Sequence, residues 1–87
     1  MSDRVLQVEV VAHEGRLWHG TGTSVQIPVV DGQLGILPGR QPLLAMLKAG
    51  TVSVTTKDGV ETFTIEGGFA SVDSDFVTVV ADHGTVS

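Results

Sequence analysis

The sequence predicts an all-β domain, either a small antiparallel sandwich or a barrel. Short segments in which apolar and polar residues alternate are separated by Gly, Asp or Pro turn signals every ~8–12 residues. The apolar residues are mainly Val, Ile and Leu, with three Phe, one Trp and no Tyr. β-Branched side chains pack well on a pleated surface, so this composition favours strands. A chain of 87 residues is expected to form one domain, residues 1–87.

The first half of the chain predicts three strands. Glu14-Gly15 is a turn signal, the glycines within 20–22 interrupt the pattern, and Pro28 has no backbone N–H to donate to a neighbouring strand. Between these signals apolar and polar residues alternate, which is typical of half-buried strands. The predicted strands cover residues 5–12, 16–20 and 23–27.

Residues 31–47 are predicted to connect the two halves. Glycines and two prolines precede an apolar run, Leu-Leu-Ala-Met-Leu. Gly and Pro hold backbone angles that other residues adopt only at a cost, so a connection of this composition keeps one shape and is a candidate for recognition. Residues 43–48 are the only segment that could be helical, over about one turn.

The second half predicts two hairpins. Asp58-Gly59 is a strong signal for a two-residue hairpin turn, and Phe63 and Ile65 are expected to face inward. Gly67-Gly68 marks a bulge or a sharp bend, and a last hairpin turns at 73–75. The predicted strands cover residues 51–55, 61–66, 69–72 and 76–81.

Charge and composition exclude several classes of partner. The net charge is −5, and the five basic residues are scattered, so no basic stripe exists for nucleic acid or for an anionic lipid surface. The chain has no cysteine, which excludes a disulfide and a thiolate metal site. It shows no secretion signal and no apolar run of ~18–20 residues, so the cytosol is the expected compartment.

No catalytic residue, cofactor site or metal site is predicted. The histidines (His13, His19 and His83) are far apart in sequence, which favours surface residues over a zinc site. The serines lack a Gly-x-Ser-x-Gly context. The segment 20–24 lacks the Lys of a phosphate loop, and Asp73-Ser74-Asp75 fits a hairpin turn better than a calcium loop. The sequence therefore predicts a protein that is not an enzyme.

Three classes of function are compatible with this fold. The first is an interaction module without a reaction of its own. The second is a small β-sandwich that binds a ligand such as a carbohydrate or a peptide, but such modules expose aromatic platforms, and Trp18 is the single Trp. The third, a metal-dependent hydrolase, would need clustered His and carboxylate side chains.

A series of motifs supports the first class. The run Gly-Ile-Leu-Pro-Gly-x-x-Pro-Leu-Leu, followed about twenty residues later by Gly-Gly-Phe, closely resembles the N-terminal domain of the epsilon subunit of bacterial F-type ATP synthase. The resemblance covers essentially the whole chain and implies a flattened β-sandwich of about ten short strands. The segments that carry it are 8–20, 31–39, 42–45, 67–69 and 77–82.

The resemblance implies a non-catalytic rotor subunit of the central stalk, peripheral on the cytoplasmic face of the bacterial cell membrane. Such a subunit binds gamma and the c-subunit ring and couples proton translocation to ATP synthesis. By position, the contacts with the c ring would be made by Asp31, Gly32, Gln33 and Leu34. The contacts with gamma would be made by Ala12, His13, Arg40, Leu43 and Ala45.

Two positions differ from many relatives. An acidic residue often stands where this chain has Gln33, and a His often stands where it has Arg40. Because Arg40 is always cationic, its expected partner on gamma is a carboxylate or a carbonyl. An apolar contact patch with a polar rim is expected to include Leu43 and Ile36. The alternative is that both leucines of Pro-Leu-Leu belong to the core.

Members of the family usually continue into two C-terminal helices that inhibit ATP hydrolysis and in some species bind ATP. The sequence here ends at Ser87, just past the last predicted strand. Neither inhibition by these helices nor ATP binding is predicted for this chain.

Overall fold

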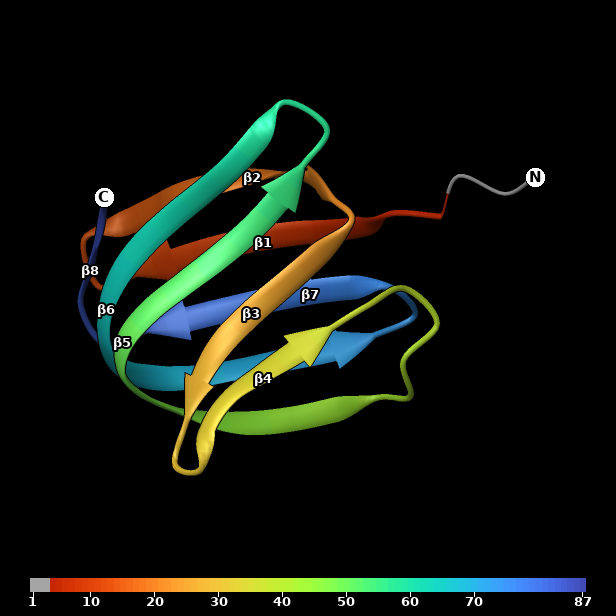
Figure 1. Cartoon of the computed structure of the whole chain (residues 1–87). Coiled ribbons are helices and arrows are strands. Elements are labelled where there is room, and N and C mark those ends of the chain that lie inside the picture. Colours follow the sequence, from red (N-terminus) through yellow and green to blue (C-terminus); the bar gives the residue numbers. More distant parts are fainter. Residues whose placement is uncertain (1–3) are drawn as a thin grey trace.

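The computed structural model describes residues 4–87, and within them it contains eight strands and no helix (Figure 1). Alternating segments that are rich in Val and Thr form these strands, as the sequence predicts. The strands are β1 (Leu6–Ala12), β2 (Gly15–Gly22), β3 (Ser24–Val29), β4 (Gly32–Ile36), β5 (Leu43–Thr56), β6 (Gly59–Asp73), β7 (Phe76–Ala81) and β8 (Gly84–Val86).

The strands form one sheet that folds over on itself. Its order is β2-β1-β7-β6-β5-β3-β4, and β8 also pairs with β6. Strands β5 and β6 are 14 and 15 residues long, and each contributes one half to each layer. Residues 68–73 of β6 pair with β7, whereas residues 63–65 pair with β8. Figure 1 shows β5 and β6 turning over at the same edge of the molecule.

Each layer therefore contains five strand segments. Layer 1 has the order β2-β1-β7-β6-β5, and layer 2 has the order β4-β3-β5-β6-β8. The eight strands thus supply about ten short segments, and the predicted flattened β-sandwich is confirmed. The molecule measures 38 × 25 × 20 Å. Because β2 and β4 end the order, the sheet is open and does not form a barrel.

One strand pair departs from the antiparallel prediction. Strands β1 and β7 run parallel, with Gln7 beside Phe76 and Val11 beside Val80, while the other pairs are antiparallel. A tight hairpin turn forces two strands to be antiparallel. No such turn joins β1 to β7, because strands β2 to β6 lie between them in the chain.

The core fills the space between the two layers. Phe63 is its largest fully buried side chain, and the described residues contain no buried polar or charged side chain. The inward positions alternate with exposed ones on β1, β5 and β6, which confirms the period of two. The buried residues are Leu6, Val8, Val10, Val25, Ile27, Ile36, Leu47, Val52, Val54, Phe63, Ile65, Ala70, Val72, Val77, Val79 and Ala81.

The helical alternative for residues 43–48 is wrong. These residues begin β5 and pair with the second half of β6, with Leu43 opposite Val72 and Leu47 opposite Gly68. A run of apolar residues with no clear period fits a helix or a strand equally well. Pairing with β6 decides for the strand here.

Several other boundaries differ from the prediction, and strand β8 was not predicted. Strand β2 continues through 20–22 and ends only before Thr23. Pro28 lies within β3 opposite Gln33, although the pairing of β3 with β5 does end earlier, at Gln26. The connection 31–47 contains a strand, β4, which pairs with β3. The actual loop between β4 and β5 is shorter and spans residues 37–42.

The predicted bend at Gly67-Gly68 is confirmed. Both residues have positive φ angles, +93° and +125°, and they lie where β6 passes from layer 2 to layer 1. A Cβ atom on Gly68 would overlap the carbonyl oxygen of Val80 and lie 2.8 Å from the Cα atom of Ala81. Only glycine allows β7 to approach the bend this closely.

A polar contact joins the β1–β2 turn to the β7–β8 turn. Nδ1 of His83 lies 3.0 Å from Oε2 of Glu14, and the backbone N–H of Gly84 donates to Oε1 at 3.4 Å. The hydrogen bond from His83 lowers the pKa of Glu14, and the same bond raises the pKa of His83, helped by the charges of Glu66 and Asp82. The ring of His13 lies edge-on to that of His83, with centroids 5.6 Å apart.

We predict that Gly68→Ala lowers the free energy of unfolding by about 3 kcal/mol or more. The new methyl group would overlap a backbone oxygen, and an alanine at this position would have to keep a positive φ angle. Urea denaturation measures this change. Gly15→Ala has a similar φ angle but an open environment, and Gly35→Ala has neither problem. Equal losses in all three variants would contradict the steric explanation.

We predict that Glu14→Gln returns the pKa of His83 toward its ordinary value of 6.5, with a smaller shift remaining from Glu66 and Asp82. NMR titration of the His83 ring protons measures the change. The stabilising effect of a raised pKa is complete below the ordinary value and is lost as the pH rises through the raised one. Indistinguishable titration curves for both proteins would show that the pair does not form in solution.

Candidate functional site

Strand β5 presents apolar side chains to solvent on the outer face of layer 1. Leu44 and Met46 are 69% and 73% exposed, whereas Leu43 and Ala45 pack against the core. Successive side chains of a strand point to opposite faces, so the apolar run at 43–47 is divided between the core and the surface. Leu44 and Met46 are two positions apart on the strand, so both lie on its outer face.

The apolar surface continues across the neighbouring strands. Met46 lies directly opposite Phe69 on β6, which is 40% exposed, and Phe69 lies opposite Val80 on β7. Residues that are directly opposite in a sheet share one face. Val80 is in turn beside Val11 on β1. We call this surface the apolar stripe, and it consists of Leu44, Met46, Phe69, Val80 and Val11.

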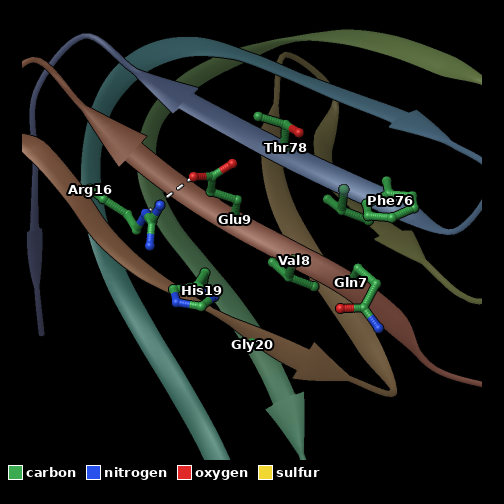
Figure 2. A pocket seen from close by; sticks show the side chains of 9 residues that line it. Gln7, Val8, Glu9, Arg16, His19, Gly20, Phe76 and Thr78 are labelled. Carbon is green, nitrogen blue, oxygen red and sulfur yellow. Dashed lines mark ion pairs between the residues drawn. The ribbon is translucent and has the colours of Figure 1, made fainter.

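A shallow hollow of about 260 Å³ lies over β1, β2 and β7 (Figure 2). Within it, Nε of Arg16 lies 3.2 Å from Oε2 of Glu9, and both side chains are about half exposed. These charges satisfy each other, and Figure 2 draws the ion pair between Arg16 and Glu9 and none to His19. The hollow therefore offers a polar surface but no arrangement of acid and base for catalysis. Its lining is Gln7, Val8, Glu9, Arg16, His19, Gly20, Phe76, Val77 and Thr78.

A carboxylate fastens the loop 37–42 to the turn between β6 and β7. Oδ1 of Asp75 accepts a hydrogen bond from the backbone N–H of Gly39 at 2.7 Å, and Oδ2 accepts one from Nη2 of Arg4 at 2.7 Å. The Gly39 bond and the Arg4 contact lower the pKa of Asp75, so this carboxyl is ionised at neutral pH. We call Asp75, Gly39 and Arg4 the loop clasp.

The residues predicted to face the c ring lie at the turn between β3 and β4 and at the start of β4. Asp31, Gly32 and Gln33 are exposed, and Gly32 has a φ angle of +126°. Leu34 is half-buried and packs against the core. Val30, the first residue of the turn, is 77% exposed. Figure 1 shows this turn at the bottom of the view, and the loop 37–42 follows the other end of β4.

The residues predicted to face gamma are divided between surface and interior. His13 and Arg40 are exposed, whereas Ala12, Leu43 and Ala45 are half-buried against the core. Arg40 lies between two shallow hollows at the surface of its loop. Ile36 is 0% exposed, so the expectation that it contributes to a surface patch is wrong.

Sequence reasoning missed the most exposed residues of this surface. Leu44 and Met46 could have been found by applying strand alternation to 43–47, because Leu43 and Leu47 then face inward. Phe69 follows from its position opposite Met46 only once the register is known. No sequence signal indicates the loop clasp, since Asp75 is 36 residues from Gly39 and 71 from Arg4.

Two further properties limit the chemistry available. Among residues 4–87, no group of three or more His, Cys, Asp or Glu side chains is arranged to hold a metal ion. The fold brings His13 and His83 together, which their sequence separation did not suggest, but no third ligand completes the group in this part of the chain. The same residues contain no helix long and apolar enough to cross a membrane.

Comparison with known proteins gives consistent matches. The family model of the β-sandwich domain of the ATP synthase delta/epsilon chain matches residues 5–85. The ATP synthase epsilon chain of Rhodococcus jostii is 42% identical over 84 residues, which are 94% of this chain and 69% of the relative. The epsilon chain of Micrococcus luteus is 46% identical over 77 residues, which are 87% of this chain and 85% of the relative.

Solved structures have the same fold. A chain in the mitochondrial ATP synthase of Euglena gracilis superposes with a TM-score of 0.85 at 19% identity, over 99% of this chain and 58% of that chain. A chain of the central stalk and c-ring assembly of Tetrahymena thermophila superposes with a TM-score of 0.78 at 13% identity, over 97% and 68% of the two chains. On the family match and on the identity to the curated relatives, this chain belongs to the ATP synthase delta/epsilon family and forms its β-sandwich domain.

Proposed function

We propose that this chain is a non-catalytic subunit of the central stalk of an F-type ATP synthase. It binds the gamma subunit and the c-subunit ring, and so couples proton translocation to ATP synthesis. It is peripheral to the membrane, on the cytoplasmic face of the bacterial cell membrane. Its family membership and the epsilon chains among its relatives support this role. The absence of a catalytic arrangement in the described residues is compatible with it.

The apolar stripe is the observation that carries the proposal. Monomeric soluble proteins rarely leave a contiguous apolar surface of this kind uncovered. Leu44, Met46 and Phe69 lie on a rigid sheet and would be covered in a complex. A subunit that transmits force between two others needs a rigid binding surface. Burial of an apolar sheet face supplies affinity without a conformational change in the sheet.

We assign the gamma contact to layer 1 and to the neighbouring loop 37–42. Arg40 supplies a permanent positive charge beside β5, which complements a carboxylate or a carbonyl on gamma. Leu43 and Ala45 pack inward against the core and hold the strand in place. Leu44 and Met46 contribute the exposed side chains of the contact. Ala12 and His13 lie on β1 and its turn, at the far end of the same layer.

We assign the c-ring contact to Asp31, Gly32, Gln33 and Leu34, at the β3–β4 turn and the start of β4. The turn protrudes at the bottom of the view in Figure 1, and the loop 37–42 follows the other end of β4. Its exposed members are polar, which suits the polar loops of a c ring. Leu34 anchors the turn from below through its contact with the core. The two assigned surfaces are therefore joined directly by strand β4.

We predict that Leu44→Asp weakens binding to recombinant gamma at least about 30-fold, equivalent to about 2 kcal/mol, because it places a charge within an apolar contact. The melting temperature should change little, since Leu44 is exposed. Isothermal titration calorimetry measures the affinity. Val60→Asp is the matched control, because Val60 is 59% exposed and belongs to layer 2.

A second comparison separates surface from core on the same strand. Leu43→Asp should lower the melting temperature, since Leu43 packs against the core. If Leu44→Asp binds gamma as tightly as the unmodified chain, the apolar stripe is not the gamma surface.

We predict that the double variant Asp31→Lys, Gln33→Lys weakens binding of the gamma complex to the c ring about tenfold and leaves the affinity for gamma unchanged. Reversing the charge of an exposed turn alters a contact at that turn without disturbing the core. Co-sedimentation with purified c ring measures the effect. Loss of gamma binding in this variant would place the turn in the gamma contact instead.

A further inference from the structure

The loop 37–42 is held by a single side chain from a distant turn. Among the described residues, the bond from the Gly39 N–H to Oδ1 of Asp75 is the only side-chain hydrogen bond to this loop. The second carboxylate oxygen binds Arg4, whose guanidinium lies against the face of Gly39. One carboxylate thus joins the N-terminal segment, the loop and the β6–β7 turn.

Asp75 is itself rigidly placed. It and Ser74 form the two-residue turn between β6 and β7, with φ angles of +64° and +51°. Asp is among the few residues with a side chain that tolerate this conformation. The carbonyl oxygen of Asp75 also accepts a hydrogen bond from the N–H of Gln7 at 2.8 Å, which fixes the turn against β1. The carboxylate therefore has a defined position from which to hold Gly39.

The clasp determines where the neighbouring residue points. Arg40 directly follows Gly39 and lies between two shallow hollows, one formed by residues 40–43 and the other by Gly35 with residues 37–40. Gly39 has a φ angle of +87°, a conformation that it would readily exchange for others if its N–H were free. Release of the clasp would leave the Arg40 side chain distributed over several directions.

We propose that Asp75 is a positioning residue, whose carboxylate holds the Gly39–Arg40 backbone so that the Arg40 guanidinium is directed toward an acidic group of the partner. Asp75 does not touch the partner itself. This role rests on the proposed binding of gamma. Its energetic basis is preorganisation, because a loop that is already in its bound shape loses less conformational entropy on binding.

The first test needs no partner. In ¹⁵N-edited NMR spectra, the amide resonance of Gly39 should shift with pH as the Asp75 carboxyl titrates, with a midpoint below the ordinary Asp value of 3.8. In Asp75→Asn this titration should disappear. Asn tolerates the same positive φ angle, so the turn is kept while the charge is lost. Asp73→Asn, in the same turn but outside the clasp, should leave the Gly39 titration unchanged.

The second test measures binding to gamma by calorimetry. Asp75→Gly removes the acceptor of the Gly39 N–H and tolerates the positive φ angle, so it should weaken the affinity about tenfold with little change in melting temperature, whereas Asp73→Asn should bind as the unmodified chain does. Because Asp75 acts through Arg40, the variant Arg40→Ala should weaken binding, and adding Asp75→Gly to it should cause no further loss.

The outcomes separate the clasp from the proposed function. A Gly39 resonance that does not titrate, or an Asp75→Gly protein that binds gamma normally, overturns the positioning role. Independent and additive effects of Asp75→Gly and Arg40→Ala also overturn it. If the unmodified chain does not bind gamma at all, the proposed function and with it the partner-directed role are rejected, whatever the Gly39 titration shows.

Discussion

The sandwich depends on the close approach of β7 to the bend of β6 at Gly68. Strands β5 and β6 form one long hairpin that supplies the middle of both layers, so the two layers are one sheet folded over. The fold-over requires a positive φ angle at Gly67 and Gly68 and no side chain against the backbone of Val80. If β6 could not bend here, residues 69–73 could not pair with β7, and layer 1 would lose its central β6–β7 pair.

The same fold-over decides which residues reach the surface. The first half of β5 forms the edge of layer 1. Because Leu43 and Leu47 pack into the core, the side chains between them alternate between the inner and outer faces in one fixed register. Leu44 and Met46 are then directed outward beside Phe69. The apolar surface is thus a consequence of register: a shift of one residue would bury Leu44 and Met46 and expose Leu43 and Ala45.

Local patterns were sufficient to predict most of the fold. The alternation in 5–12, the hairpins near Asp58-Gly59 and 73–75, and the bend at Gly67-Gly68 all depend on neighbouring residues, and each was confirmed. The strand at 43–47 was not recognised, because an apolar run has no period and only its partner strand identifies it. The parallel β1–β7 pair and the contacts of Asp75 depend on residues far apart in the chain, which no local pattern can relate.

The two assigned contact surfaces are linked by a short and well-supported element. Strand β4 has five residues, so it spans roughly 17 Å between the turn at 30–31 and the loop 37–42. It is anchored inward by Leu34 and by the fully buried Ile36, and it pairs along its length with β3. A force applied at the turn therefore passes into the close-packed core, which deforms little. At its other end β4 leads into the loop 37–42, where Gly39 donates a hydrogen bond to Asp75 and so joins the loop to layer 1. Without the hydrogen bond from Gly39 to Asp75, the loop would be the most flexible segment between the two surfaces. Arg40 would then move independently of the rigid sandwich.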